Sequence, residues 1–328
     1  MLMKSYWIQT QGQGMHLDMR EVEVPQPQAG QLRVRLHAAA LNRGELIAGH
    51  GLHAPNQPAR AAGFEAAGVV DAVGPGVSRF QVGDAVMGRC DGAFAEFGLM
   101  HEAEIHPKPA TLNWAQAASS IITYSTAHDT LMVQGHLRAG EWVLVTGVTS
   151  GVGVACLQLA KALGARVIGS SGSADKLARL QSLGLDVPLH TRAAGIAQAT
   201  LAATDQRGAD VAVLSVGGSV LDECIQALGF QGRLGVIGYV DGDVRPTLDL
   251  LSLHKKRLHI YGVSNKMRQM PHRIEAAQRF AHDVLPLMSR GDVVPLVDRV
   301  YPFDQLTQAQ RDMESNQQVG KLVLSIRD

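Results

Sequence analysis

The residues of this chain that most plainly suggest chemistry lie in VLVTGVTSGVGVACLQLAKALGARV, residues 143–167, a stretch that four glycines interrupt. Residues 143–145 predict a strand, and the residues after Gly153 predict a helix that runs to Leu163. Glycine lets the turn between them adopt positive φ and approach an anion closely, and the free N–H groups at the helix start face that anion. The stretch therefore predicts a cradle for a pyrophosphate. Its candidate cofactor-binding residues are Thr149, Ser150, Gly151, Val152 and Gly153.

The next predicted strand and its turn, RVIGSSGSADK, lie close to where a dinucleotide-binding fold places the residue that reads the adenine ribose. An NAD site usually has Asp or Glu there, whereas this chain has Ser170, Ser171, Gly172 and Ser173, followed by Lys176. Hydroxyl groups, a helix N-terminus capped by Ser173 and an ammonium group would converge on a 2′-phosphate. The sequence therefore favours NADP over NAD as the cofactor. In the alternative interpretation, Ser173 only caps its helix and Lys176 is a solvated surface residue.

The glycine pattern alone does not decide the enzyme class. The strict GxGxxG spacing is not met, because Val148 and Ser150 occupy the first two glycine positions when Gly153 is aligned with the third. The letters TGVTSGVG also match TGxxxGxG, the phosphate loop of the short-chain dehydrogenases. Those enzymes open with this motif and need a Tyr-x-x-x-Lys pair, and none of the five tyrosines here has a lysine four residues on. The sequence therefore argues against that class.

The elements that must position these residues follow two patterns. Up to about residue 120, short apolar runs alternate with Gly, Pro and Asp, which predicts a β-domain. From about 122 to 262, strands alternate with helices, which predicts a parallel sheet covered on both faces. The tail holds one helical stretch, 273–291, and a final strand, GKLVLSI, that is free to pair with the first domain. We therefore expect an α/β protein, with a β-domain of residues 1–121 and 263–328 and a nucleotide-binding domain of residues 122–262.

Composition and charge argue against several classes of protein. The 328 residues are 46% hydrophobic and 18% charged, with a formal net charge of zero, so the field that attracts nucleic acid or anionic lipid is absent. No stretch approaches the roughly 18 apolar residues needed to cross a bilayer, and the first residues lack a secretory signal. Cys90, Cys156 and Cys224 lie far apart, which predicts core thiols in a reducing compartment. We expect a cytoplasmic protein with no nucleic-acid or membrane partner.

Nearly the whole chain resembles the medium-chain dehydrogenase/reductase superfamily. GFEAAGVVDAVGPGVSRFQVGDAVMG, residues 63–88, is similar to the family signature GxExxGxVxxVGxxVxxxxxGDxV. ITYSTAHDTL is similar to the stretch that enters the nucleotide domain, and QQVGKLVL is similar to the closing strand. The resemblance implies a GroES-like β-domain, formed by the N-terminal part and the C-terminal tail, and a Rossmann domain with a doubly wound parallel sheet.

Zinc-dependent alcohol dehydrogenases of that superfamily require a Cys in the segment that here reads ALNRGEL and a His directly after the glycine of GFE. Asn42 and Phe64 stand in those places. Only Cys90 lies between Gly83 and Leu99, where a structural zinc lobe would carry four cysteines. The resemblance therefore narrows to the zinc-free quinone oxidoreductase branch, the ζ-crystallin-like proteins, and we expect no metal.

The same resemblance implies further site residues. Asn42 would donate a hydrogen bond to the nicotinamide ribose or the acceptor oxygen, Glu45 would orient Asn42 or relay a proton, and Thr126 would lie near the nicotinamide. The alternatives are an Asn42 that only forms a turn, a Glu45 that pairs with Arg43 or Arg60, and an ordinary helical Thr126. The remaining cofactor-binding candidates, most of them at predicted strand ends, are Arg192, Val216, Gly217, Gly238, Tyr239, Val263 and Ser264.

The expected absence of a metal restricts the chemistry. A simple ketone is hard to polarise without a Lewis acid, whereas hydride added to an enone or a quinone spreads its charge over an enolate or hydroquinone oxygen. By resemblance, we expect hydride transfer from NADPH to a quinone or an α,β-unsaturated carbonyl. Two alternatives stay open: a zinc-free reductase of acyl-CoA or haloacrylate acceptors, and a non-catalytic NADPH-binding protein. The predicted edge strand LHIYGVS leaves backbone groups unpaired, so we also expect a homodimer.

Overall fold

The chain divides into two units in the computed structural model, which describes residues 1–11, 14–47, 56–265 and 267–327. Unit 1 comprises Met1–Ser125 and Arg268–Asp328, and unit 2 comprises Thr126–Met267. The division falls a few residues after each of the expected domain ends, 121 and 262. Each unit has its own sheet structure and its own buried core.

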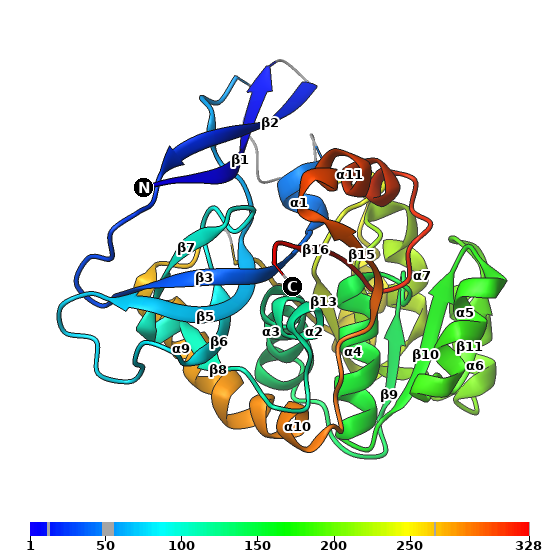
Figure 1. Ribbon diagram of the computed structural model, residues 1–328. Helices are drawn as coiled ribbons and strands as arrows, with labels where there is room; N and C mark the ends of the chain where they lie inside the picture. Colours follow the sequence, from blue (N-terminus) through cyan, green and yellow to red (C-terminus); the bar gives the residue numbers. More distant parts are fainter. Residues whose placement is uncertain (12–13, 48–55, 266, 328) are drawn as a thin grey trace. The chain divides into compact units, whose positions relative to one another are not determined.

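Unit 1 is mainly β-structure, as its short apolar runs predict. One of its sheets has the order β2-β1-β4, and a larger sheet has the order β15-β16-β3-β5-β6-β8, with β7 also paired to β3 (Figure 1). The strands are β1 (Leu2–Gln11), β2 (Gly14–Glu23), β3 (Gln31–Ala40), β4 (Arg60–Ala61), β5 (Glu65–Val73), β6 (Ala85–Arg89), β7 (Phe97–His101), β8 (Ile105–Pro107), β15 (Val297–Pro302) and β16 (Lys321–Ser325).

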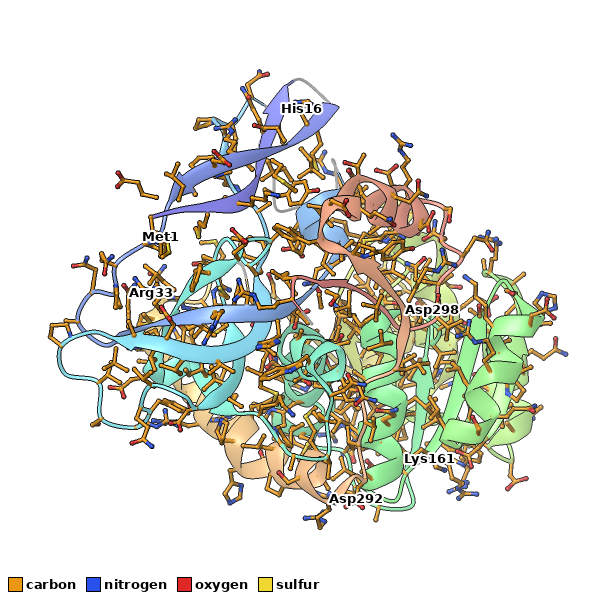
Figure 2. The ribbon with its side chains drawn as sticks, viewed as in Figure 1. Met1, His16, Arg33, Lys161, Asp292 and Asp298 are labelled. Atoms are coloured by element: carbon orange, nitrogen blue, oxygen red, sulfur yellow. The ribbon has the colours of Figure 1, made fainter. Side chains whose placement is uncertain are left out.

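Strand β3 lies in the middle of the larger sheet because its sequence alternates. In QLRVRLHAAA every second residue of the first half is apolar, and Leu32, Val34 and Leu36 are fully buried. On the other face, Arg33, which Figure 2 labels, forms an ion pair with Asp71 of β5 at 2.6 Å. β3 therefore offers one face to the core of unit 1 and keeps its charged groups on the other.

The last strand, β16, joins this sheet, as the sequence predicts. It runs antiparallel to β3, with Val323 opposite Ala40 and Leu324 opposite Ala39, and parallel to β15. Lys321 is the first residue of β16 and is buried. The tail therefore completes a sheet that the N-terminal strands begin, and it brings one charged side chain into unit 1.

The helical stretch expected over 273–291 is two helices. α9 ends at Asp283 and α10 begins at Leu285. Pro286, in the first turn of α10, has no N–H to bond the carbonyl four residues before it, so the ladder of α9 cannot continue through it. The helical segments of unit 1 are α1 (Arg43–Leu46), η1 (Glu102–Glu104), α2 (Trp114–Ala118), α9 (Met270–Asp283), α10 (Leu285–Arg290), η5 (Phe303–Gln305) and α11 (Leu306–Glu314), while α3 (Ile121–His128) continues into unit 2.

Unit 2 has a parallel sheet in the order β11-β10-β9-β12-β13-β14, which is the doubly wound order that the alternation of strands and helices predicts. β9 reads WVLV and is buried along its whole length, as a strand covered on both faces must be. α4 packs on β9 and β10, and α5 packs on β10 and β11 (Figure 1).

The strands of unit 2 are β9 (Trp142–Val145), β10 (Arg166–Ser171), β11 (Val187–His190), β12 (Ala209–Leu214), β13 (Leu228–Val236) and β14 (His259–Gly262). The helical segments are the π-helical η2 (Asp129–Gln134), α4 (Gly151–Ala162), α5 (Ala174–Leu180), η3 (Gln181–Leu183), α6 (Ile196–Ala203), η4 (Gly218–Val220), α7 (Leu221–Ala227) and α8 (Leu250–Lys255).

The three cysteines are buried free thiols, as their spacing predicts. Burial raises the pKa of the Cys156 and Cys224 thiols to about 12, so these thiols stay protonated and act as small core residues. Among the helices of the described residues, none combines the length and the apolar character that a bilayer span requires.

Candidate functional site

The glycine-rich turn between β9 and α4 has the local structure of an anion cradle. Ser150 caps α4, and its Oγ accepts a hydrogen bond from the Gly153 N–H at 3.1 Å. The Val148 N–H donates to the Ser170 carbonyl at 3.0 Å, which fastens the turn to the end of β10. The twelve residues of α4 therefore direct their N-terminal N–H groups and positive dipole end toward the carboxyl end of the sheet.

Two glycines of this turn are required by geometry. Gly147 has a φ of +63°, in the left-handed region that glycine favours. A Cβ at Gly153 would lie 2.5 Å from the Gly147 carbonyl oxygen, closer than real Cβ atoms approach any heavy atom. Gly153 therefore meets the steric requirement of the third glycine in a dinucleotide-binding turn, where the missing side chain lets the helix pack closely.

The turn after β10 holds hydroxyl groups beside an arginine. Thr149 Oγ1 and Ser171 Oγ lie 3.3 Å apart, and Ser171 Oγ also accepts from the Ser173 N–H at 3.3 Å. Ser173 caps α5, as the sequence predicts. Next to them, a Cβ at Gly172 would lie 2.7 Å from Nε of Arg192, so the exposed Arg192 side chain rests directly on this glycine. The structure thus places Arg192, which follows β11, beside the serines that follow β10.

The other candidates of unit 2 lie at the carboxyl ends of β12, β13 and β14. Gly217 has a φ of +131°, and a Cβ there would lie 1.9 Å from Oδ1 of Asp241. The Asp241 N–H donates to the Val216 carbonyl, and its Oδ2 accepts from the Ser219 N–H, both at 2.9 Å. The backbone at Val216 and Gly217 is therefore held in place by the loop after β13. Gly238 and Tyr239 follow β13, and Val263 and Ser264 follow β14.

Parallel strands end at the same edge of their sheet, so all the cofactor candidates of unit 2 belong to one edge, the carboxyl edge. Open α/β sheets bind ligands at this edge, where the strand order reverses. In this sheet the reversal falls between β9 and β12, and the glycine-rich turn follows β9. The structure therefore collects residues that the sequence distributes from 149 to 264.

Unit 1 contains a buried cluster of polar side chains. Lys321 Nζ lies 2.9 Å from Oε1 of Glu65, and the side chains of the two residues are only 6% and 0% exposed. The same ammonium group donates to Oδ1 of Asn42 at 2.6 Å and to the Leu41 carbonyl at 2.7 Å. Oε2 of Glu65 accepts from the Ile122 N–H at 2.9 Å. We call Asn42, Glu45, Glu65 and Lys321 the amide cluster, because its members surround the Asn42 amide.

Both ends of the Asn42 amide are engaged in the amide cluster. Nδ2 donates to Oε1 of Glu65 at 3.0 Å and to Oε1 of Glu45 at 3.2 Å, and Oδ1 accepts from Lys321. An amide nitrogen has two hydrogens, so these two bonds use its donor capacity. Asn42 is therefore held in one orientation, and a bond to any other acceptor requires that one of the two carboxylate bonds be exchanged.

Glu45 is fully buried next to a second carboxylate. Its Oε1 also accepts from the Asn42 backbone N–H at 2.8 Å. Burial raises the pKa of Glu45 to about 8, and Glu65 adds to the increase, while Lys321 and the bonds from Asn42 oppose it. Arg43 points elsewhere, because it donates to the Met313 carbonyl at 2.8 Å. The sequence leaves several roles open for Glu45. These hydrogen bonds correspond to the role in which Glu45 orients Asn42.

Two members of the amide cluster, Glu65 and Lys321, escaped the sequence analysis. Both lie in stretches that it quoted, GFEAAG and GKLVL, and both are charged residues that open a strand and are followed by apolar residues. That local signal marks each of them as unusual, because a charged residue at the start of a buried strand needs a partner. Thr126, the third catalytic candidate, belongs to unit 2, where its carbonyl accepts a hydrogen bond from Thr130 Oγ1 at 2.7 Å.

No three His, Cys, Asp or Glu side chains in the described part of the chain are grouped so that they could hold a metal ion. His101 caps η1 by accepting a hydrogen bond from the Ala103 N–H. His106 is buried and packs on Phe280 at a ring distance of 5.0 Å. Burial lowers the pKa of His106 to about 4, so its imidazole is a neutral core side chain rather than a surface group.

Two family models match this chain, and together they cover both units. The model described as alcohol dehydrogenase GroES-like domain matches residues 28–110, and the model described as zinc-binding dehydrogenase matches residues 151–282. A quinone oxidoreductase of Rattus norvegicus is 33% identical over 313 residues, which are 93% of this chain and 92% of the relative. Prostaglandin reductase-3 of Mus musculus is 31% identical over 320 residues, which are 94% of this chain and 84% of the relative.

Solved structures are similar over almost the whole chain. A mycobacterial protein in complex with NADPH has a TM-score of 0.85 at 26% identity and covers 99% of this chain and 100% of its own. The CurK enoyl reductase has a TM-score of 0.84 at 25% identity and covers 98% of this chain and 99% of its own. Both architectures expected from the sequence, the GroES-like domain and the Rossmann domain, are therefore confirmed.

The raised pKa of Glu45 predicts a specific dependence of stability on pH. On folding, the pKa of Glu45 rises from its ordinary 4.5 to about 8. The folded protein therefore loses stability as the pH increases through that interval, because Glu45 must then either bind a proton on folding or be buried as a charge. We expect Glu45→Gln and the natural protein to have similar free energies of unfolding near pH 4.5. At pH 9 the variant should be more stable by on the order of 2 to 4 kcal/mol.

Urea unfolding followed by tryptophan fluorescence measures this difference, since Trp7 and Trp114 belong to the same unit as Glu45. Glu314→Gln, which removes an exposed carboxyl group from α11, is the matched control and should follow the pH dependence of the natural protein. A stability difference between Glu45→Gln and the natural protein that does not change with pH would contradict the prediction.

Proposed function

Because the chain belongs to the medium-chain dehydrogenase/reductase superfamily, in its quinone oxidoreductase branch, we propose that it transfers hydride from NADPH to a quinone or an α,β-unsaturated carbonyl without a metal ion. Membership of this branch makes the protein a nicotinamide-dependent oxidoreductase. The observation that carries the finer proposal is the amide cluster. It places a fixed amide, two carboxyl groups and an ammonium group at the segment where zinc-dependent members carry a cysteine ligand.

The carboxyl edge of unit 2 fits a dinucleotide. Gly153 lets the start of α4 pack directly on the turn, because a Cβ there would lie 2.5 Å from the Gly147 carbonyl oxygen, and the N–H groups of α4 can then face a pyrophosphate. When bound, the cofactor supplies the hydride. The backbone at Val216, Gly217, Val263 and Ser264 would hold its nicotinamide end, since these residues follow β12 and β14 at the same edge of the sheet. Thr126 is proposed as a further contact of that end.

The turn after β10 supports the choice of NADPH over NADH. Serine hydroxyl groups and the Arg192 guanidinium lie side by side there, with Lys176 at the start of α5. A phosphate monoester accepts hydrogen bonds from each of these groups, and a guanidinium matches the oxygens of a phosphate in pairs. We assign Ser170, Ser171, Lys176 and Arg192 to the 2′-phosphate end of the site.

The amide cluster is proposed to supply the acceptor with a hydrogen-bond donor in place of a Lewis acid. Reduction of a conjugated acceptor builds negative charge on one oxygen, and a fixed hydrogen-bond donor stabilises that charge. Asn42 Nδ2 is this donor once it exchanges its longer bond, the one to Glu45, for a bond to the oxygen. Lys321 and Glu65 keep the amide in place during the exchange, because they hold its other atoms.

The proposal is tested by following the absorbance of NADPH and NADH with a panel of quinones, enones and alcohols, with and without a chelator. We expect quinones or enones to be reduced with NADPH, and the rate to be unaffected by the chelator. Alcohol oxidation that the chelator abolishes would contradict the metal-free proposal. NADPH that binds without turnover across the panel would favour the non-catalytic alternative.

Arg192→Gln should weaken the preference for NADPH. Loss of a charge-assisted bond to the 2′-phosphate is worth about 1.5 to 3 kcal/mol, so we expect the KM for NADPH to rise roughly 10- to 100-fold while the KM for NADH stays the same. Arg207→Gln is the matched control, since Arg207 precedes β12 and so lies at the opposite edge of the sheet. Equal changes in the KM values for NADPH and NADH would contradict the assignment of Arg192 to the 2′-phosphate site.

Asn42→Ala should lower kcat. Loss of one fixed donor to a developing oxyanion costs about 10²- to 10³-fold in rate, and the KM for NADPH should change little. Asn113→Ala removes another asparagine that caps a short helix of unit 1, and it should leave kcat unchanged. A kcat for Asn42→Ala that matches the control would show that Asn42 does not act on the acceptor.

We also propose a homodimer formed through the edge of the unit 2 sheet. β14 is an edge strand, and edge strands present unpaired backbone groups. Val244, Leu250 and Leu251 of the same unit are 60%, 67% and 73% exposed, so they offer apolar side chains to a partner. Light scattering should give twice the chain mass of 35.0 kDa.

The double variant Leu250→Glu, Leu251→Glu should shift this mass toward that of the monomer, because it places four charged groups per dimer in an apolar contact. Val82→Glu, at a valine of unit 1 that is 60% exposed, should leave the measured mass unchanged. A natural protein that scatters as a monomer would end the dimer proposal. The cytoplasmic location stays a prediction of the sequence.

A further inference from the structure

Two arginines flank one aromatic ring in unit 1. The guanidinium carbons of Arg60 and Arg89 each lie 5.5 Å from the centroid of the Phe64 ring. All three side chains are partly exposed. They come from three separate segments: Arg60 begins β4, Phe64 precedes β5, and Arg89 ends β6. We call these residues the arginine–phenyl cluster.

The backbone at Phe64 is held in place both before and after this residue. Its neighbour Gly63 has a φ of +103°, and a Cβ there would lie 2.7 Å from the Phe94 nitrogen. The Phe64 carbonyl accepts from the Cys90 N–H at 2.9 Å. Glu65, the next residue, belongs to the amide cluster. The arginine–phenyl cluster therefore lies one residue from the groups assigned to the acceptor, at the position where zinc-dependent members of the family carry a histidine.

The positive charge of Arg89 is only partly compensated. Its Nη2 meets Oδ1 of Asp91 at 3.0 Å, but the Asp91 side chain is 67% exposed, so the pair is weak. Among the described residues, the buried Nε of Arg89 meets no hydrogen-bond acceptor. Glu65 is the cross-strand partner of Arg89, yet its carboxylate oxygens are directed to Lys321, Asn42 and the Ile122 N–H.

A guanidinium that lies over a phenyl ring keeps its N–H groups in its own plane, where they remain able to bind an anion. Each guanidinium centre is 5.5 Å from the same centroid, so the two positive charges lie within about 11 Å of each other. The ring orients both guanidinium groups, because each lies over it. Two fork-shaped cations held on one ring match a molecule that carries an acidic group.

We propose that Arg60, Phe64 and Arg89 form a specificity site for acceptors that bear an anionic substituent, a carboxylate or a sulfonate, on a planar conjugated body. The inference rests on the proposed reductase function and deepens it, because it selects one class among the quinones and enones. Arg60 and Arg89 supply the charges that bind the anionic group, and Phe64 holds the two guanidinium groups in place. The site thus favours an acidic acceptor over its neutral counterpart.

The test compares 1,2-naphthoquinone with 1,2-naphthoquinone-4-sulfonate as acceptors. Each charge-assisted contact at a partly exposed site is worth about 1 kcal/mol or somewhat more. We therefore expect Arg89→Gln, and separately Arg60→Gln, to lower kcat/KM for the sulfonate roughly 5- to 50-fold, mainly through KM. The same variants should change kcat/KM for the neutral quinone by less than about 2-fold. Arg89→Lys should restore part of the loss.

Arg79→Gln is the matched control. The guanidinium carbon of Arg79 lies 5.4 Å from the Phe80 ring centroid, in the same unit, and no second arginine of the described residues lies over that ring. This variant should treat both acceptors as the natural protein does. An equal loss for both acceptors in Arg89→Gln and Arg60→Gln, or no loss for either, would overturn the proposal. The two variants are independent, so a folding defect in one leaves the other to decide.

A binding measurement separates this inference from the proposed function. 2-Naphthalenesulfonate has the planar body and the anionic group but cannot be reduced, so calorimetry with it does not depend on turnover. We expect the natural protein to bind it at least 5-fold more tightly than Arg89→Gln and Arg60→Gln, with an affinity that falls as salt is added. Equal affinities would overturn the arginine–phenyl site even if quinones are reduced. Binding with the expected difference, but without reduction of any acceptor, would contradict the reductase function alone.

Discussion

Unit 1 depends on the buried ion pair between Lys321 and Glu65. Two charges at 6% and 0% exposure lose most of their hydration, and this loss is offset only when every remaining donor and acceptor finds a partner. Here the ammonium group meets two further oxygens, and the carboxylate meets an amide and a backbone N–H. Removal of either partner would leave an uncompensated buried charge, which typically costs about 3 to 5 kcal/mol. The pair therefore links β16 to β5, and through the Asn42 amide it also links both strands to the segment that contains Asn42.

The candidate residues of the two units differ in kind. In unit 2 the proposed cofactor contacts are mostly backbone groups next to glycines such as Gly153 and Gly217, and side chains are proposed mainly for the 2′-phosphate. In unit 1 the important atoms belong to side chains, and their charges are set by burial and by one another. A backbone cradle suits a cofactor whose phosphates are the same in every enzyme that uses it, whereas a side-chain cluster can be adjusted to one acceptor.

Much of the architecture could be predicted because it follows from local patterns. The short apolar runs of the first 120 residues indicate β-strands, the apolar residues 143–145 indicate a strand of a parallel sheet, and the structure confirms both. The glycine-rich turn, the cap at Ser173 and the return of the last strand are confirmed for the same reason. The stretch 273–291 was predicted wrongly as one helix, because its apolar spacing continues across Pro286 while the backbone hydrogen bonds do not.

The sequence by itself determined the type and order of the elements and the family signature, since these depend on residues that are neighbours along the chain. Only the tertiary structure decided which distant side chains share a site. Lys321 and Glu65 are 256 residues apart, and Arg192 reaches the serines after β10 from the end of another strand. No local periodicity encodes such pairs, because hydrogen bonds and ion pairs act over about 3 Å in space whatever the separation along the chain. The sequence shows that residue 321 is a lysine. Only the tertiary structure shows that its ammonium group binds the Asn42 amide.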